Sequence, residues 1–110
     1  MPTIYHLVSP RAWEQHPEAP YRADSLASEG FIHCSFAPQV APSANRFYAG
    51  EQDLLVLHID AARLTSPLRE EPSGTGEVFP HIHGPLNRDA VVAVHRLTRD
   101  ADGRWQFKES

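Results

Sequence analysis

The chain has 110 residues, of which 41% are hydrophobic and 22% are charged. This length fits one domain with a single core, and the composition is that of a globular protein rather than a disordered one. The formal net charge is −4 at pH 7, which argues against a protein whose binding is driven by nucleic-acid phosphates. We therefore expect one domain over residues 1–110, and a nucleic-acid partner is disfavoured.

The first half of the sequence predicts short strands separated by short helices. Ser9 and Pro10 form a typical helix start, and Gly30 is a typical helix stop. On the helix over residues 38–48 the apolar side chains at 40, 44, 47 and 48 should share one face. The expected strands are 3–8 and 31–35, and the expected helices are 10–15, 24–30 and 38–48.

The second half of the sequence is mainly β-structure. Residues 53–60 have apolar side chains on both alternating faces, which predicts a central strand. The turn residues at 72–76 and 100–103 indicate a loop and a hairpin. The remaining elements are a single turn at 61–64 and strands at 68–71, 77–82, 90–98 and 104–108. This order favours the α+β class over regular βαβ alternation.

The compartment follows from the single cysteine and the lack of a leader-like segment. Cys34 has no partner for an intrachain disulfide. The first residues lack the basic and apolar regions of a signal peptide. The longest apolar run, residues 54–57, is far too short to span a membrane. We expect a cytoplasmic protein without a membrane partner.

Two histidine-containing blocks mark the strongest candidate site. His81 and His83 are two residues apart, so on a strand they lie on one face and could share a ligand or a metal. A zinc site would need a third ligand such as His33, Cys34 or His58. In the alternative, one imidazole bonds a loop carbonyl and the other is exposed. We favour that alternative and expect no metal.

The other block, residues 30–35, places a histidine and a serine on the same face of a strand. Alternation turns His33 and Ser35 to one side, and Cys34 to the core as a small buried hydrophobe. His33 and Ser35 could bind a hydroxylated ligand at a cleft. His6, on an apolar strand face, is either a hydrogen-bonded core histidine or a ligand anchor.

Further candidates lie on the main helix and before the second histidine block. Asn45 and Tyr48 could face the same cleft if the helix packs beside the second strand. Glu71 or Glu77 could bond a ribose hydroxyl or stabilise a cationic transition state. In the alternative these glutamates are solvated surface charges.

Several separated blocks, in this order, closely resemble the small bacterial DUF952 family. The blocks are Ile4-Tyr5-His6, Ser25-Leu26 with Glu29-Gly30-Phe31-Ile32-His33-Cys34-Ser35, Ala44-Asn45 with Phe47-Tyr48, Leu57 with Ile59-Asp60, and Phe79-Pro80-His81-Ile82 with Gly84-Pro85-Leu86-Asn87. The family usually has tyrosine where this chain has His83, so the resemblance does not require a paired-histidine metal site.

The resemblance implies a fold similar to that of ADP-ribosyltransferases, with a split, mainly antiparallel sheet, short helices and NAD in a central cleft. On this basis His6 would contact the adenosine ribose, and His33 with Ser35 would lie at the nicotinamide side. Glu71 or Glu77 would take the acidic position at the nicotinamide ribose. The implied catalytic set is His6, His33 and Glu71. The candidate nucleotide-binding set combines His6, His33 and Ser35 with the candidates found from the residues themselves, Asn45, Tyr48 and His81.

Four functions are compatible with these residues. An NAD-utilising transferase or glycohydrolase would break the nicotinamide bond through an oxocarbenium-like transition state. A non-catalytic module would bind a nucleotide or another small ligand without turnover. A metal-assisted hydrolase would use His81 and His83, and an interaction domain would use surface aromatic residues. We rank the first two close together, then the interaction domain, and the metal-assisted hydrolase last. Likeness of fold does not by itself establish function.

Overall fold

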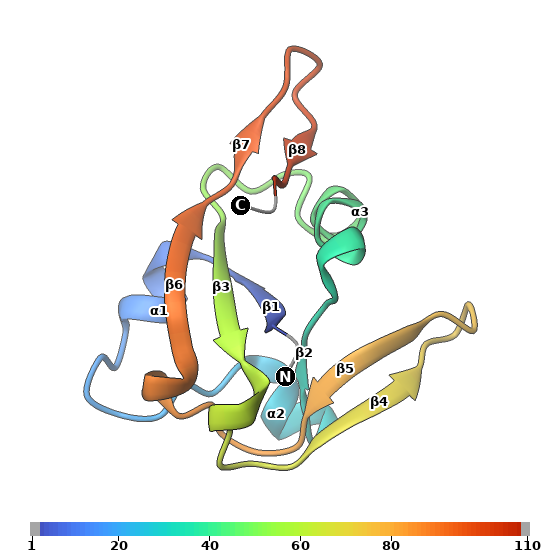
Figure 1. Cartoon of the computed structure of the whole chain (residues 1–110). Coiled ribbons are helices and arrows are strands. Elements are labelled where there is room, and N and C mark those ends of the chain that lie inside the picture. Colours follow the sequence, from blue (N-terminus) through green and yellow to red (C-terminus); the bar gives the residue numbers. More distant parts are fainter. Residues whose placement is uncertain (1–2, 109–110) are drawn as a thin grey trace.

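Two three-stranded antiparallel sheets form the framework of the molecule (Figure 1). The computed structural model describes residues 3–108, so the first and last two residues of the predicted 1–110 domain lie outside it. The first sheet has the order β1 (Thr3–Val8), β3 (Leu55–Asp60), β6 (Val91–Arg96). The second has the order β2 (Ile32–His33), β5 (Val78–Ile82), β4 (Leu68–Pro72). The α+β class with antiparallel sheets is confirmed.

A two-residue bridge joins the two sheets, and a small ribbon extends the first one. The backbones of Tyr5 and Ser35 exchange hydrogen bonds of 2.9 and 2.7 Å, which ties β1 to the chain just after β2. Strands β7 (Thr98–Arg99) and β8 (Trp105–Gln106) pair beyond the end of β6. In Figure 1 this ribbon rises above the first sheet, and the β4–β5 hairpin reaches out to the side.

The helices are short, and their ends follow from local chemistry. Helix α1 (Pro10–Glu14) starts at Ser9, whose hydroxyl accepts a hydrogen bond from the Ala12 backbone amide at 3.2 Å. Helix α2 (Asp24–Glu29) ends at Gly30, which adopts a left-handed φ of 89°. Helix α3 (Ala37–Phe47) packs against β1 and β8. The 3-10 turns are η1 (Ala61–Arg63) and η2 (Arg88–Ala90). Among the described residues no helix is long and apolar enough to cross a membrane.

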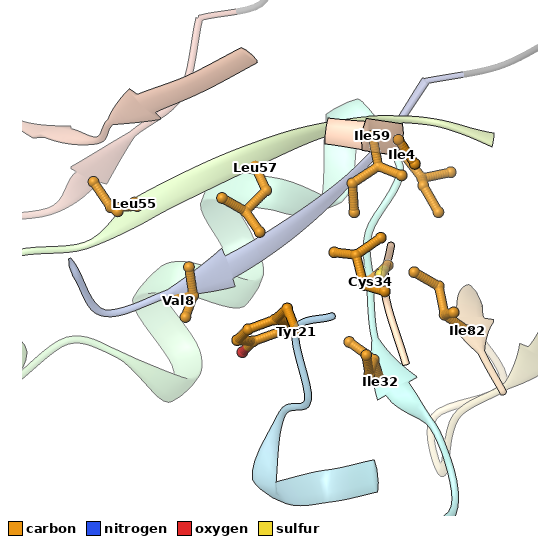
Figure 2. Packing of buried hydrophobic residues seen from close by; sticks show 11 residues of the cluster. Ile4, Val8, Tyr21, Ile32, Cys34, Leu55, Leu57, Ile59 and Ile82 are labelled. Atoms are coloured by element: carbon orange, nitrogen blue, oxygen red, sulfur yellow. The ribbon is translucent and has the colours of Figure 1, made fainter. Parts of the chain in front are cut away.

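The hydrophobic core has two parts because β1 and β3 are buried on both faces. One part lies between the two sheets, where Leu57 and Ile59 meet Ile32 and Ile82 (Figure 2). The other lies under α3 and β8, where Val56 packs with residues of the helix and the ribbon. The prediction of a central strand over residues 53–60 is therefore confirmed.

The structure differs from the predicted elements at several places, and the strand predicted over residues 104–108 is reduced to β8. The strand predicted over residues 31–35 is reduced to β2 and the Ser35 bridge. Phe47, predicted on the buried face of the main helix, is 68% exposed because Val40 and Ala44 form the face that packs on β1. The predicted strand 90–98 is interrupted at Leu97, which is buried in the core part under α3 and β8.

Candidate functional site

His6 is buried on β1 and is hydrogen-bonded at both ring nitrogens. Alternation along β1 turns it to the same face as Ile4 and Val8, and it is 5% exposed. Its Nδ1 lies 2.6 Å from the His33 carbonyl oxygen, which can only accept, so Nδ1 carries the proton. Its Nε2 lies 2.9 Å from the Tyr21 hydroxyl, which therefore donates to it.

Burial keeps this pair of side chains uncharged. Desolvation lowers the pKa of His6 from 6.5 to about 4, although the bond to the His33 carbonyl acts in the opposite direction. Burial likewise raises the pKa of Tyr21 well above its usual value. A neutral imidazole with both nitrogens engaged orients its neighbours. Because it has no free nitrogen, it does not transfer protons in this arrangement.

A cleft of about 290 Å³ opens beside the His6–Tyr21 pair. Its walls come from β1, the start of α1, the segment leading into α2, and the chain after α3. The polar residues that line it are Ser9, Gln15, Arg22, Asp24, Ser25, His33, Tyr48 and Glu51, in addition to His6 and Tyr21. The cleft therefore combines one cation, two carboxylates, hydroxyl groups and two tyrosine rings.

A second polar cluster lies on the face of the β2-β5-β4 sheet that points away from the core. The imidazoles of His81 and His83 both donate to Oε1 of Glu71, at 2.9 and 2.7 Å. These hydrogen bonds, from His83 first and then His81, hold the pKa of Glu71 below its usual value. The ring of Phe31 stacks on His81, with centroids 4.1 Å apart.

His33 connects the two regions. Its carbonyl accepts the hydrogen bond from His6, whereas its imidazole donates to the Glu29 carboxylate at 2.9 Å. The His33 ring also meets the His81 ring edge-on at 5.3 Å, because the two residues are directly opposite in the β2–β5 pair. The rings of Phe31, His33 and His81 therefore contact one another on one face of the β2–β5 pair.

The predicted site residues divide between four places. His6, His33 and Tyr48 line the cleft. Within residues 3–108 Ser35, Asn45, Glu71 and His81 do not line it. Ser35 is buried beside Tyr5, and Glu71 and His81 belong to the second cluster.

Asn45 holds the β7–β8 ribbon to the main helix. Its amide group donates to the carbonyls of Ala41 and Trp105 at 3.0 Å each and accepts from the Trp105 backbone at 2.7 Å. These bonds engage both ends of the side chain. Its position is therefore explained by packing of the C-terminal ribbon.

The arrangement favoured for His81 and His83, in which one imidazole bonds a loop carbonyl and the other is exposed, is wrong, because both imidazoles bond Glu71. Of the third ligands considered, Cys34 is buried in the core between the sheets, and His58 lies on β3 beside His95. The group that joins the histidines is Glu71, since the β4–β5 register places it on their face of the sheet. Glu77, the alternative to Glu71 for the acidic position, accepts a hydrogen bond from Gln39 at 3.0 Å.

Most of the residues that complete the cleft have no pattern in the sequence that marks them as site residues. Tyr21, Arg22 and Asp24 follow a proline-rich loop, where no periodic pattern indicates which side chains turn inward. Tyr21 is 6% exposed and its backbone pairs with Leu86, which is distant in sequence. The only local signal is a large aromatic residue just after Pro20.

Comparison with known proteins finds solved structures that are similar to this chain. Three solved structures of one protein, CC0527 from Caulobacter crescentus, are similar to this chain. Its crystal structure is 30% identical, with a TM-score of 0.84 over 94% of this chain and 93% of that chain. Its solution structure is also 30% identical, with a TM-score of 0.82. No curated protein matches the sequence.

The family comparison covers the second cluster and the rest of the cleft, but His6 lies just before the matched span. The model of the DUF952 family, described as proteins of unknown function, matches residues 7–94. This span includes Tyr21, His33, Glu71, His81 and His83 and ends inside β6. The chain therefore belongs to the DUF952 family.

Proposed function

We propose that the protein binds a nucleotide of the NAD type in the cleft beside His6 and Tyr21. The observation that carries the proposal is the neutral, doubly hydrogen-bonded His6 in the wall of an open polar cleft. Burying a polar ring with both partners in place creates a rigid surface, because breaking either bond would leave an unsatisfied buried group. Rigid polar walls of this kind suit the recognition of a small polar ligand.

The chemistry of the lining matches the parts of a nucleotide. The rings of Tyr21 and Tyr48 offer aromatic surface for a base. Arg22 offers a cation for phosphate, and Asp24 and Glu51 offer acceptors for ribose hydroxyls. The volume of about 290 Å³ is at the lower end of small-molecule pockets, which begin at roughly 300 Å³. It suits one half of a dinucleotide better than the whole.

A second candidate, cleavage of NAD, is favoured by the two carboxylates in the same cleft. In this reaction the glycosidic C–N bond breaks and nicotinamide leaves with the bonding electron pair. A carboxylate would stabilise the resulting oxocarbenium-like charge until water or an acceptor adds to it. Asp24 and Glu51 lie in the cleft, so they are better candidates for this role than Glu71. Without such a role the cleft serves as a non-catalytic binding module.

Calorimetric titration with NAD, ADP-ribose and nicotinamide mononucleotide tests binding. We expect one of the three to bind, and Arg22→Ala to weaken that binding by at least about tenfold, since losing a charged hydrogen bond costs about 1.5–3 kcal/mol. Arg104→Ala is the matched control, because Arg104 is exposed and outside the cleft. Absence of binding at millimolar ligand, or equal losses in both variants, would refute the proposal.

Nicotinamide release, followed by chromatography, separates the two candidates. Cleavage predicts release that is lost in Asp24→Asn or Glu51→Gln, whereas a binding module predicts binding without release. Tyr21→Phe removes only the hydroxyl that bonds His6. We expect it to weaken binding while the protein stays folded.

A further inference from the structure

We propose that Glu71, His81 and His83 form a binding site for a divalent transition-metal ion, zinc first, with one coordination position left open. These three residues, called here the Glu71–His81–His83 triad, lie outside the cleft of the proposed function. Two imidazoles and one carboxylate are ligands that zinc uses in three-ligand sites.

The first argument is the convergence of the donor atoms. One ligand atom from each residue lies within 4.8 Å of the other two, and the two nitrogens are 2.9 and 2.7 Å from the same carboxylate oxygen. In a tetrahedral site with metal–ligand distances of about 2.1 Å, neighbouring ligand atoms are about 3.4 Å apart. An ion would therefore fit once the ligand atoms move apart by the order of an ångström. Each imidazole would then carry its proton on the ring nitrogen that does not bind the ion.

The second argument is that the backbone holds the triad before any ion binds. Strands β4 and β5 pair in register, with Arg69 opposite His81 and Glu71 opposite Phe79. Residues two apart on a strand share a face, so His81 and His83 point the same way. The Phe31 ring stacks on His81 at an interplanar angle of 14°, which restricts rotation of that imidazole. Preorganised ligands lower the conformational cost of binding.

The third argument is access. The side chains of His81, His83 and Glu71 are 9%, 23% and 35% exposed, so the triad is anchored on one side and open to solvent on the other. Structural zinc sites are closed by four protein ligands, whereas catalytic sites keep one position for water or substrate. Three protein ligands at a partly open surface correspond to the second type. The hydrogen bond between His33 and Glu29 borders it through the ring contact of His33 with His81.

The test uses the full chain without a histidine tag, titrated with Zn²⁺ in competition with a chromophoric chelator. We expect one ion per chain, and intense visible absorption when Co²⁺ replaces Zn²⁺, as four- or five-coordinate cobalt shows. Glu71→Gln keeps an oxygen that can accept both histidine bonds but removes the charge. Since losing even an outer-shell partner costs about 10–100-fold in metal affinity, we expect Glu71→Gln and His83→Ala to lose more than about 100-fold.

His16→Ala is the matched control, because it removes an exposed imidazole from the proline-rich loop. We expect it to leave Zn²⁺ affinity unchanged. Circular dichroism of each variant checks that the fold is intact, and Glu71→Gln provides the answer if His83→Ala is unfolded. No stoichiometric Zn²⁺ binding, or equal affinity in the Glu71→Gln and unmodified chains, would overturn the proposal. NAD titration is a separate measurement, so either proposal can fail alone.

Discussion

Acidification should destabilise this protein through His6 in a defined pH window. In the unfolded chain the pKa of His6 is about 6.5, whereas burial lowers it to about 4 in the folded protein. Between these values the unfolded state binds the extra proton, so the free energy of unfolding falls as the pH decreases. The loss begins below about pH 6.5 and is complete near pH 4. Since a tenfold change in proton affinity is worth about 1.4 kcal/mol, the total is about 3 kcal/mol.

Urea unfolding at about pH 7 and about pH 4, compared with a His6→Asn variant, isolates this contribution from that of the carboxyl groups. The asparagine amide replaces the Nδ1–H donor to the His33 carbonyl but cannot be protonated. We expect the variant to be less stable at pH 7, because Tyr21 loses its acceptor. Its stability should nevertheless fall about 3 kcal/mol less between the two pH values. Parallel pH dependences for the two proteins would refute the assignment of a buried, neutral His6.

Three further predictions concern packing and reactivity. The Cys34 thiol is 3% exposed and burial raises its pKa, so a colorimetric thiol reagent should label the native protein at least about tenfold more slowly than the urea-unfolded chain. Equal labelling rates would contradict its burial. Gly84→Ala should lower the free energy of unfolding by about 1–3 kcal/mol, because the new methyl group would lie 2.9 Å from the Ser66 Cβ. Gly74→Ala, with no atom within 4 Å of the added carbon, should change it by less than about 0.5 kcal/mol in the same denaturation experiment. Asn45→Ala should remove the bonds to the β7–β8 ribbon and speed hydrogen exchange in that ribbon without affecting β3; unchanged exchange would show that Asn45 does not hold it.

The elements with strong local signals were predictable. Runs of β-forming, mainly apolar residues define β1 and β3, and Ser9 and Gly30 mark a helix start and a helix end through bonds within one or two turns. Such signals depend on neighbours in sequence and therefore survive without knowledge of the fold. Phe47 and Leu97 were harder to predict. Whether an apolar residue at the end of an element is buried depends on which distant segment covers it.

The candidate site shows the same division. Strand alternation alone indicated that His33 and Cys34 lie on opposite faces, that His81 shares a face with His83, and that Cys34 is buried. It could not show that Glu71 would bond both histidines, because that depends on the register of the β4–β5 pair. It also could not separate the triad from the cleft.

The sequence by itself determined which residue types carry the polar chemistry of this protein and which face of each strand they occupy. Periodicity along one strand contains that information. Only the tertiary structure decided that Tyr21 and the His33 carbonyl satisfy His6, and that Glu71 joins His81 to His83 elsewhere. These contacts join segments that meet only after the sheets pair and the core closes, and no local pattern specifies their partners.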